Sequence, residues 1–131
     1  MKNSLFFARL LVVVLFYFSL YGKIVHFDAQ VALTATKGVP FANIAIILAI
    51  LFESVGGTLL LIGKKGASIG ALLLILFTAI VTPIFFDFWN NPKVINNFMS
   101  NIAIIGGLLF MFFYYLEDDL KYLKKIIRKK A

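Results

Sequence analysis

The chain contains no cysteine and only one histidine among its 131 residues. Without cysteine it has neither a disulfide framework nor thiol redox chemistry of its own. The single histidine, His26, excludes a haem held by two histidines and a histidine-cluster metal site within one chain. We therefore expect no metal and no intrinsic cofactor. Charged residues are also scarce, at 15% of the chain, and only 6 residues are acidic.

Apolar side chains dominate instead, with 62% of the residues hydrophobic and a mean hydropathy of +0.97. Soluble domains are usually about 45 to 50% apolar, so this composition indicates a small polytopic membrane protein. The apolar runs lack the alternation that barrel strands need, which leaves helices as the structures that satisfy the backbone in lipid. We predict an all-α membrane bundle of four transmembrane helices at about residues 4–22, 41–62, 67–86 and 101–116.

The basic residues predict how the helices are oriented, because lysine and arginine near helix ends are retained on the cytoplasmic side. With the N-terminus inside, all of the 13 basic residues except Lys23, Lys37 and Lys93 are cytoplasmic. Both termini are therefore predicted to be cytoplasmic. Residues 117–131 are expected to form a basic amphipathic tail on the anionic cytoplasmic leaflet. No basic patch lies beside stacking aromatic residues, so nucleic acid is not an expected partner.

Glu53 is the most informative residue, because it lies in the middle of the otherwise uncharged run 41–62. A helix over this run is about 33 Å long, which places Glu53 near the hydrocarbon midplane, where an ionised group costs several kcal/mol unless it is paired. Small residues share its helix face, which predicts that this face packs inward. They are Ala42, Ala45, Ala49 and Gly56.

Counting residues from the ends of the predicted helices gives the depth of each side chain in the membrane, and equal depth predicts the partners of Glu53. Tyr17 and Thr78 reach about the same level, so their hydroxyls are the expected hydrogen-bond partners. Arg9 lies about six residues nearer the cytoplasm, and its side chain leans away from Glu53. Without a close cation, desolvation favours a neutral carboxyl group. The candidate intramembrane polar site is thus Glu53, Tyr17, Thr78 and Arg9, and it serves either to lock the helices or to handle a proton or ligand.

A second group of polar and aromatic residues lies at the predicted outer ends of the helices. Lys23 is expected to be an interfacial anchor whose charge reaches the headgroups. Alternatively, it shapes a polar mouth above the bundle together with Asp87. The candidate residues of this outer mouth are Lys23, His26, Asp87, Trp89 and Asn101.

Several short motifs, taken in order, resemble the DoxX family of small four-helix membrane proteins over most of the chain. The chain departs from the pattern at Phe86, where similar sequences often carry histidine, and at Ser100, where they often carry lysine. The matching pieces are Arg9, Gly22-Lys23, Gly38-Val39-Pro40, Glu53-Ser54-Val55-Gly56-Gly57, Phe85-Phe86-Asp87-Phe88-Trp89, Phe98-Met99-Ser100-Asn101 and Gly106-Gly107.

The resemblance implies a multi-pass protein of the bacterial or archaeal plasma membrane, associated in some relatives with quinone-linked or redox-protective oxidoreductase complexes. It suggests a membrane subunit that holds a quinone near Glu53, is not catalytic alone and needs a redox or other membrane-protein partner. Two alternatives remain: a non-enzymatic assembly or stabilising factor, and a proton-coupled carrier of a small solute. The broken mid-membrane helices typical of carriers are missing from the sequence.

Overall fold

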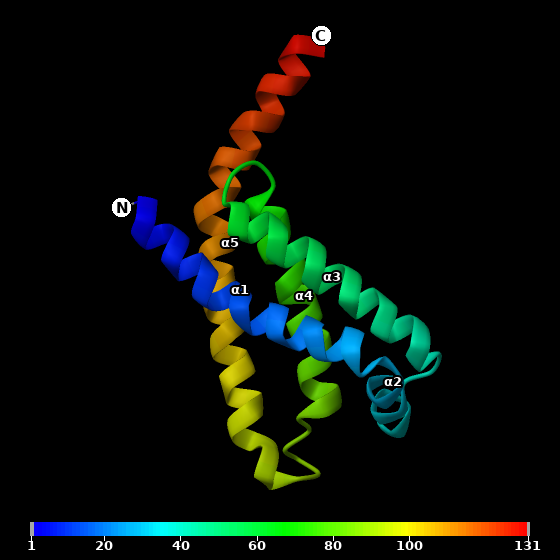
Figure 1. The fold of residues 1–131 in the computed structure, drawn as a ribbon. Coiled ribbons are helices and arrows are strands. Elements are labelled where there is room, and N and C mark those ends of the chain that lie inside the picture. The colour runs from blue at the N-terminus through cyan, green and yellow to red at the C-terminus, as the bar shows by residue number, and fades with distance from the viewer. Residues whose placement is uncertain (1, 131) are drawn as a thin grey trace.

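The computed structural model describes residues 2–130, and within them it contains helices and no strands (Figure 1). Four of the helices, α1, α3, α4 and α5, are long and apolar enough to cross a membrane. The predicted all-α bundle of four membrane-spanning helices is therefore confirmed. The elements are α1 (Lys2–Val25), α2 (Phe27–Thr36), α3 (Ala42–Ile62), α4 (Ala67–Phe85), the short 3-10 helix η1 (Pro92–Val94) and α5 (Ile95–Lys130).

The bundle has two different ends (Figure 1). At one of them, the terminal end, lie the start of α1, the turn between α3 and α4 and the C-terminal part of α5. The other, the loop end, carries α2 and the connection between α4 and α5. At the terminal end Gly63 (φ +68°) and Gly66 (φ +89°) adopt left-handed conformations that favour glycine, and between them the chain reverses from α3 into α4.

Two helix boundaries differ from the sequence prediction. Residues 23–40 lie between the first two predicted helices, 4–22 and 41–62, but α1 continues to Val25 and α2 follows almost at once. The fourth helix was expected over 101–116, but α5 begins at Ile95 and runs unbroken to Lys130. Residues 117–130 contain no glycine or proline that would end the helix, so they extend it in line rather than folding back toward the bundle (Figure 1).

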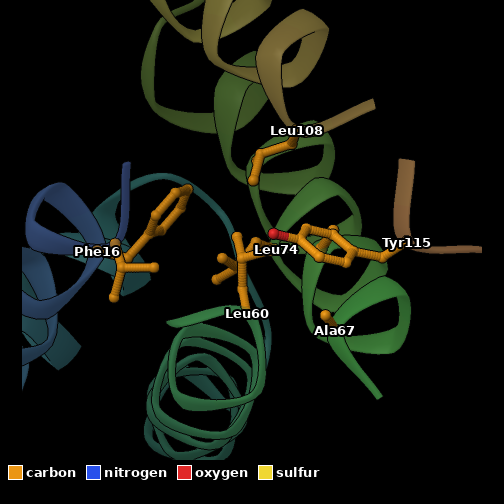
Figure 2. Packing of buried hydrophobic residues seen from close by; sticks show 8 residues of the cluster. Phe16, Leu60, Ala67, Leu74, Leu108 and Tyr115 are labelled. Atoms are coloured by element: carbon orange, nitrogen blue, oxygen red, sulfur yellow. The ribbon is translucent and has the colours of Figure 1, made fainter. Parts of the chain in front are cut away.

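The apolar core joins all four long helices (Figure 2). Leu60 of α3 and Leu74 of α4 lie at its centre and are fully buried. Phe16 of α1 covers one side, and Leu108 and Tyr115 of α5 cover the other (Figure 2). Most other large apolar side chains are exposed, as expected of helices whose outer faces contact lipid.

Glycine allows α3 and α4 to pack at very short range. A Cβ atom on Gly70 would lie 2.6 Å from the carbonyl oxygen of Gly56 and 2.7 Å from the amide nitrogen of Leu60. The small-residue face predicted for residues 41–62 thus packs against α4 through Gly56. Ala103 and Gly107 of α5 are also small, but both are exposed, and no described atom outside the backbone of α5 lies within 4 Å of a Cβ built on Gly107. Instead, α5 packs through larger side chains.

A set of polar contacts at the terminal end, the terminal clamp, fixes α5 to the α3–α4 turn. The carboxylate of Asp119 accepts hydrogen bonds from the amides of Gly66 and Ser68, both at 3.0 Å, and from the Ser68 hydroxyl. It therefore caps the N-terminus of α4, whose first amides have no partner within their own helix. Arg9 donates to the Tyr115 hydroxyl at 2.6 Å and to the Leu61 carbonyl at 3.3 Å.

These contacts hold Asp119 in its charged form. Partial burial acts to raise its pKa, but the hydrogen bonds from the Ser68 hydroxyl and from the two amides outweigh this effect and hold the pKa below its usual range. The ionised carboxylate is therefore the form that stabilises the fold.

Replacing Gly70 with alanine should destabilise the bundle, because the added methyl group meets backbone atoms that cannot move independently. We expect a loss of about 1 to 3 kcal/mol, the usual range for overpacking. Gly107→Ala is the matched control, since the same methyl group there meets open space. It should leave stability unchanged or slightly raised. Thermal unfolding in a mild detergent measures both, and equal melting temperatures for the two variants would contradict the close α3–α4 contact.

Replacing Asp119 with alanine should cost about 1 kcal/mol at neutral pH through loss of a helix cap. Because the pKa of Asp119 is lower in the folded state, the stabilisation by the cap is complete at pH values above the unfolded-state pKa of about 3.9. It disappears as the pH falls through the lower folded-state value. The difference in melting temperature between wild type and Asp119→Ala should therefore be constant above about pH 4 and should shrink as the pH is lowered further. The exposed neighbour Asp118 provides the control, and a similar effect of Asp118→Ala would contradict a specific cap.

Candidate functional site

Glu53 forms a buried ion pair with Lys23. The Glu53 side chain on α3 is fully buried, and its Oε1 lies 2.6 Å from the Nζ atom of Lys23, a residue of α1 whose side chain is 12% exposed. Ser19 completes the cluster, because its hydroxyl accepts from Lys23 Nζ at 2.6 Å and donates to Glu53 Oε1 at 3.4 Å. We call these three residues the polar cluster. No cation close to Glu53 was predicted from the sequence, but the Lys23 ammonium group is one.

Lys23 reaches Glu53 because α1 and α3 pair about one helical turn away from the expected register. The Tyr17 hydroxyl lies 2.9 Å from that of Thr58, and a Cβ atom on Gly57 would lie 3.0 Å from the Tyr17 ring. Tyr17 is therefore level with Gly57 and Thr58, one turn nearer the terminal end than Glu53. The next turn of α1, which carries Ser19 and Lys23 on one face at positions i and i+4, is the turn that faces Glu53.

Thr78 and Arg9, the other expected partners of Glu53, also form their hydrogen bonds with other groups. Thr78 is buried on α4, but its hydroxyl donates to the Leu74 carbonyl of its own helix at 2.8 Å. Arg9 belongs to the terminal clamp. The predicted grouping of Glu53 with Tyr17, Thr78 and Arg9 is therefore not present among the described contacts.

One polar atom of the cluster has no partner. Glu53 Oε2 is buried and accepts no hydrogen bond from any residue of the described chain. Lysine has three N–H donors, and two of those on Lys23 are used by Glu53 and Ser19. Because buried polar atoms are nearly always hydrogen-bonded, these open positions mark the cluster as a place where a further polar group can bind.

A cavity of about 760 Å³ adjoins the polar cluster, bounded by α1, α2, α3, α4 and the start of α5. Its volume falls within the range of about 300 to 1,000 Å³ that is typical of small-molecule sites. Most of the lining is apolar and includes Phe16, Phe52 and Phe77. The Nζ atom of Lys23 lies 5.2 Å from the centre of the Phe77 ring. The polar lining residues are Ser19, Lys23, Gln30, Thr34, Lys37, Thr78 and Asn101.

The five residues of the predicted outer mouth do not form one site. Lys23 and Asn101 both line the cavity, and the Asn101 amide donates to the Thr82 hydroxyl at 3.0 Å. His26 is exposed at the junction of α1 and α2.

The other two mouth residues belong to the connection between α4 and α5. Asp87 accepts from the Asn90 side chain at 3.0 Å, and this hydrogen bond holds the pKa of Asp87 below its usual range. The Trp89 ring packs edge-on against Phe88 and Phe98. These two residues therefore stabilise the connection.

The sequence prediction missed four of the polar residues that line the cavity. Ser19 had a detectable signal, since it lies one helical turn before Lys23 on the same face. Gln30, Thr34 and Lys37 had none, because they belong to α2 or directly follow it. That segment was expected to be a loop, so its contribution to the cavity depends on a helix that the prediction lacked.

Breaking the ion pair from either side should destabilise the protein. Lys23→Met or Glu53→Leu leaves one buried partner without its counterpart, and such losses typically cost about 3 to 5 kcal/mol. The double variant Lys23→Met/Glu53→Leu removes both charges and should recover most of the stability. Denaturant unfolding of the two single variants and the double variant provides the measurement. If the effects of the two replacements simply add, Lys23 and Glu53 are not coupled.

One comparison with known proteins, the scan against family models, finds a match. The family model described as DoxX matches residues 4–87, which is more than half of the chain and contains Ser19, Lys23 and Glu53. Neither the search of curated proteins nor the search of solved structures finds a significant match. The matched segment covers nearly all of α1 and the whole of α2, α3 and α4, and with them the polar cluster, so this multi-pass membrane protein belongs to the DoxX family.

Proposed function

We propose that this protein is the quinone-binding membrane subunit of an oxidoreductase complex in the plasma membrane, with both termini in the cytoplasm. The observation that carries the proposal is the cavity beside the polar cluster, in which an apolar wall adjoins a buried lysine with a free donor. Membership of the family is consistent with this role, and the chemistry of the cavity gives the specific reason for a quinone.

The residues present fit the two parts of a prenylated quinone. Its headgroup is a flat ring with two carbonyl oxygens that accept hydrogen bonds, and Lys23 has one N–H that neither Glu53 nor Ser19 uses. The aromatic rings of Phe16, Phe52 and Phe77 offer surfaces for the headgroup ring. The isoprenoid tail is apolar, as most of the lining is.

Each member of the polar cluster has a separate task in this proposal. Lys23 orients a carbonyl oxygen of the headgroup, and Glu53 holds the lysine side chain in place within the low-dielectric interior. Ser19 fixes the direction of the ammonium group by accepting one of its protons. A bound quinone supplies two-electron redox chemistry, and the electrons come from a partner protein because the chain has no cysteine and a single histidine.

Protein purified with its native lipid should carry a prenylquinone that organic extraction and mass spectrometry detect. Ala49→Phe places a ring inside the cavity and should abolish this recovery. Ala103→Phe makes the same change on an exposed face of α5 outside the cavity and should leave recovery unchanged. The double variant Lys23→Met/Glu53→Leu keeps the cavity but removes the carbonyl donor, so its quinone content should fall.

Two outcomes would contradict the proposal. Equal recovery from Ala49→Phe and Ala103→Phe would mean that the quinone is carried over with bulk lipid. Absence of both quinone and copurifying redox proteins would favour the non-enzymatic assembly role.

A further inference from the structure

The polar groups in and beside the cavity offer a ligand mainly hydrogen-bond acceptors. Glu53 Oε2 is a buried carboxylate oxygen that accepts no hydrogen bond within residues 2–130. Three hydroxyl groups of the lining have already donated their protons, either to Glu53 or to a backbone carbonyl of their own helix. Since a hydroxyl group has a single proton, each of these three can bind a ligand only as an acceptor. They belong to Ser19, Thr34 and Thr78.

Free donors are fewer close to the polar cluster. Lys23 keeps one N–H beyond those that Glu53 and Ser19 use. The Asn101 amide donates one proton to Thr82 and can offer a ligand either its second N–H or its carbonyl oxygen. Gln30 and Lys37 also carry donors, on α2 or directly after it. The polar cluster itself therefore has one open donor, on Lys23, and an open acceptor, Glu53 Oε2.

A hydroxyl group is the simplest ligand group that fills both open positions of the polar cluster. Lys23 belongs to the lining, and Oε1 of the Glu53 carboxylate lies 2.6 Å from its Nζ atom, so the open donor and the open acceptor belong to one ion pair. A hydroxyl oxygen can accept from Lys23 while its proton is donated to Glu53 Oε2. A carbonyl oxygen fills the first position only, and it leaves the buried carboxylate oxygen without a partner, which is costly.

We propose that the cavity binds the reduced, dihydroxy form of its ligand, a quinol, in preference to the quinone. The inference rests on the proposed function, because it states which redox form of that ligand the site favours. Quinone and quinol share the same ring and the same isoprenoid tail, so the apolar lining does not distinguish them. The preference arises at the polar cluster, where only the quinol has a proton to donate.

A preference for the quinol also changes the redox potential of the bound ligand. Quinone and quinol differ by two electrons and two protons, and tighter binding of the reduced form makes reduction more favourable. At fixed pH, each tenfold preference raises the midpoint potential of a two-electron pair by about 30 mV. The bound ligand therefore accepts electrons from a redox partner more readily than the same ligand free in the bilayer.

Equilibrium dialysis of the delipidated protein under nitrogen tests the preference with three probes. They are a benzoquinone with one isoprene unit, its quinol, and the dimethyl ether of that quinol. The quinol should bind about tenfold more tightly than the quinone, as expected of one additional hydrogen bond to a charged group. The ether keeps both oxygens as acceptors but has no hydroxyl proton, so it should bind no more tightly than the quinone.

The outcomes of the dialysis separate this inference from the proposed function. Equal affinities for quinone and quinol, or an ether that binds as tightly as the quinol, overturn the preference but leave the quinone site in place. If none of the three probes binds, the proposed function is contradicted together with the inference. A redox titration of the bound ligand that shows no upward shift of the midpoint potential also overturns the preference.

A variant of Glu53 tests the origin of the preference. Glu53→Gln replaces a carboxylate that only accepts with an amide that also donates, so the preference for the quinol should fall to parity or reverse toward the quinone. Glu117→Gln makes the same change at an exposed residue of α5 outside the cavity and should keep the wild-type preference. Because the readout is the ratio of two affinities in one sample, partial loss of folded protein leaves it unchanged. A Glu53→Gln variant with the full quinol preference overturns the inference.

Discussion

The ion pair between Lys23 and Glu53 is the constraint on which the rest of the bundle depends. Neither charge can lie alone in the hydrocarbon, so the two helices that carry them must meet at one register. This condition holds the loop end of α1 against the middle of α3 and places Tyr17 against Gly57. A one-turn slip would bury the carboxylate among apolar side chains. The ion pair therefore fixes the register of α1 against α3, which apolar packing alone would not specify.

The cavity follows from this docking and from the glycine contact on the other side of α3. Gly56 and Gly70 bring α4 close to α3, and α5 packs against α4 through Leu108 and Tyr115. The helix α2 follows α1, and α1, α2, α4 and the start of α5 all contribute side chains to the lining of the cavity. Ala45 and Ala49 of α3 also line the cavity, and their small side chains leave its volume unfilled. The small-residue face of α3 thus has two effects. At Gly56 it allows α4 to pack closely, and at Ala49 it leaves space for the cavity.

Much of the fold could be predicted from the sequence, because long apolar runs and small-residue faces depend on local composition. The four helices and the inward-packing small face of α3 belong to this part. The composition of the site depended on the register between α1 and α3. The membrane depth of residues in α1 was counted from the end of its apolar run, and it was wrong by about one turn because α1 continues past Gly22 to Val25. Lys23 was therefore assigned to the interface instead of to Glu53. The capping of α4 by Asp119 had no local signal, because the two residues it joins are 53 and 51 positions away in the sequence.

The two ends of the bundle use their polar groups in opposite ways, and this difference bears on the class of ligand. At the terminal end, Asp119 and Arg9 satisfy backbone and hydroxyl groups and leave α5 firmly held. Beside the cavity, Glu53 Oε2 and one proton of Lys23 remain open, while the pair as a whole carries no net charge. A neutral pair attracts an ion only weakly but still offers a strong charge-assisted donor. The free N–H of Lys23 suits a neutral acceptor with a large apolar body, as in the ligand we propose, whereas Glu53 Oε2 is itself an acceptor that a quinone carbonyl would leave unpaired.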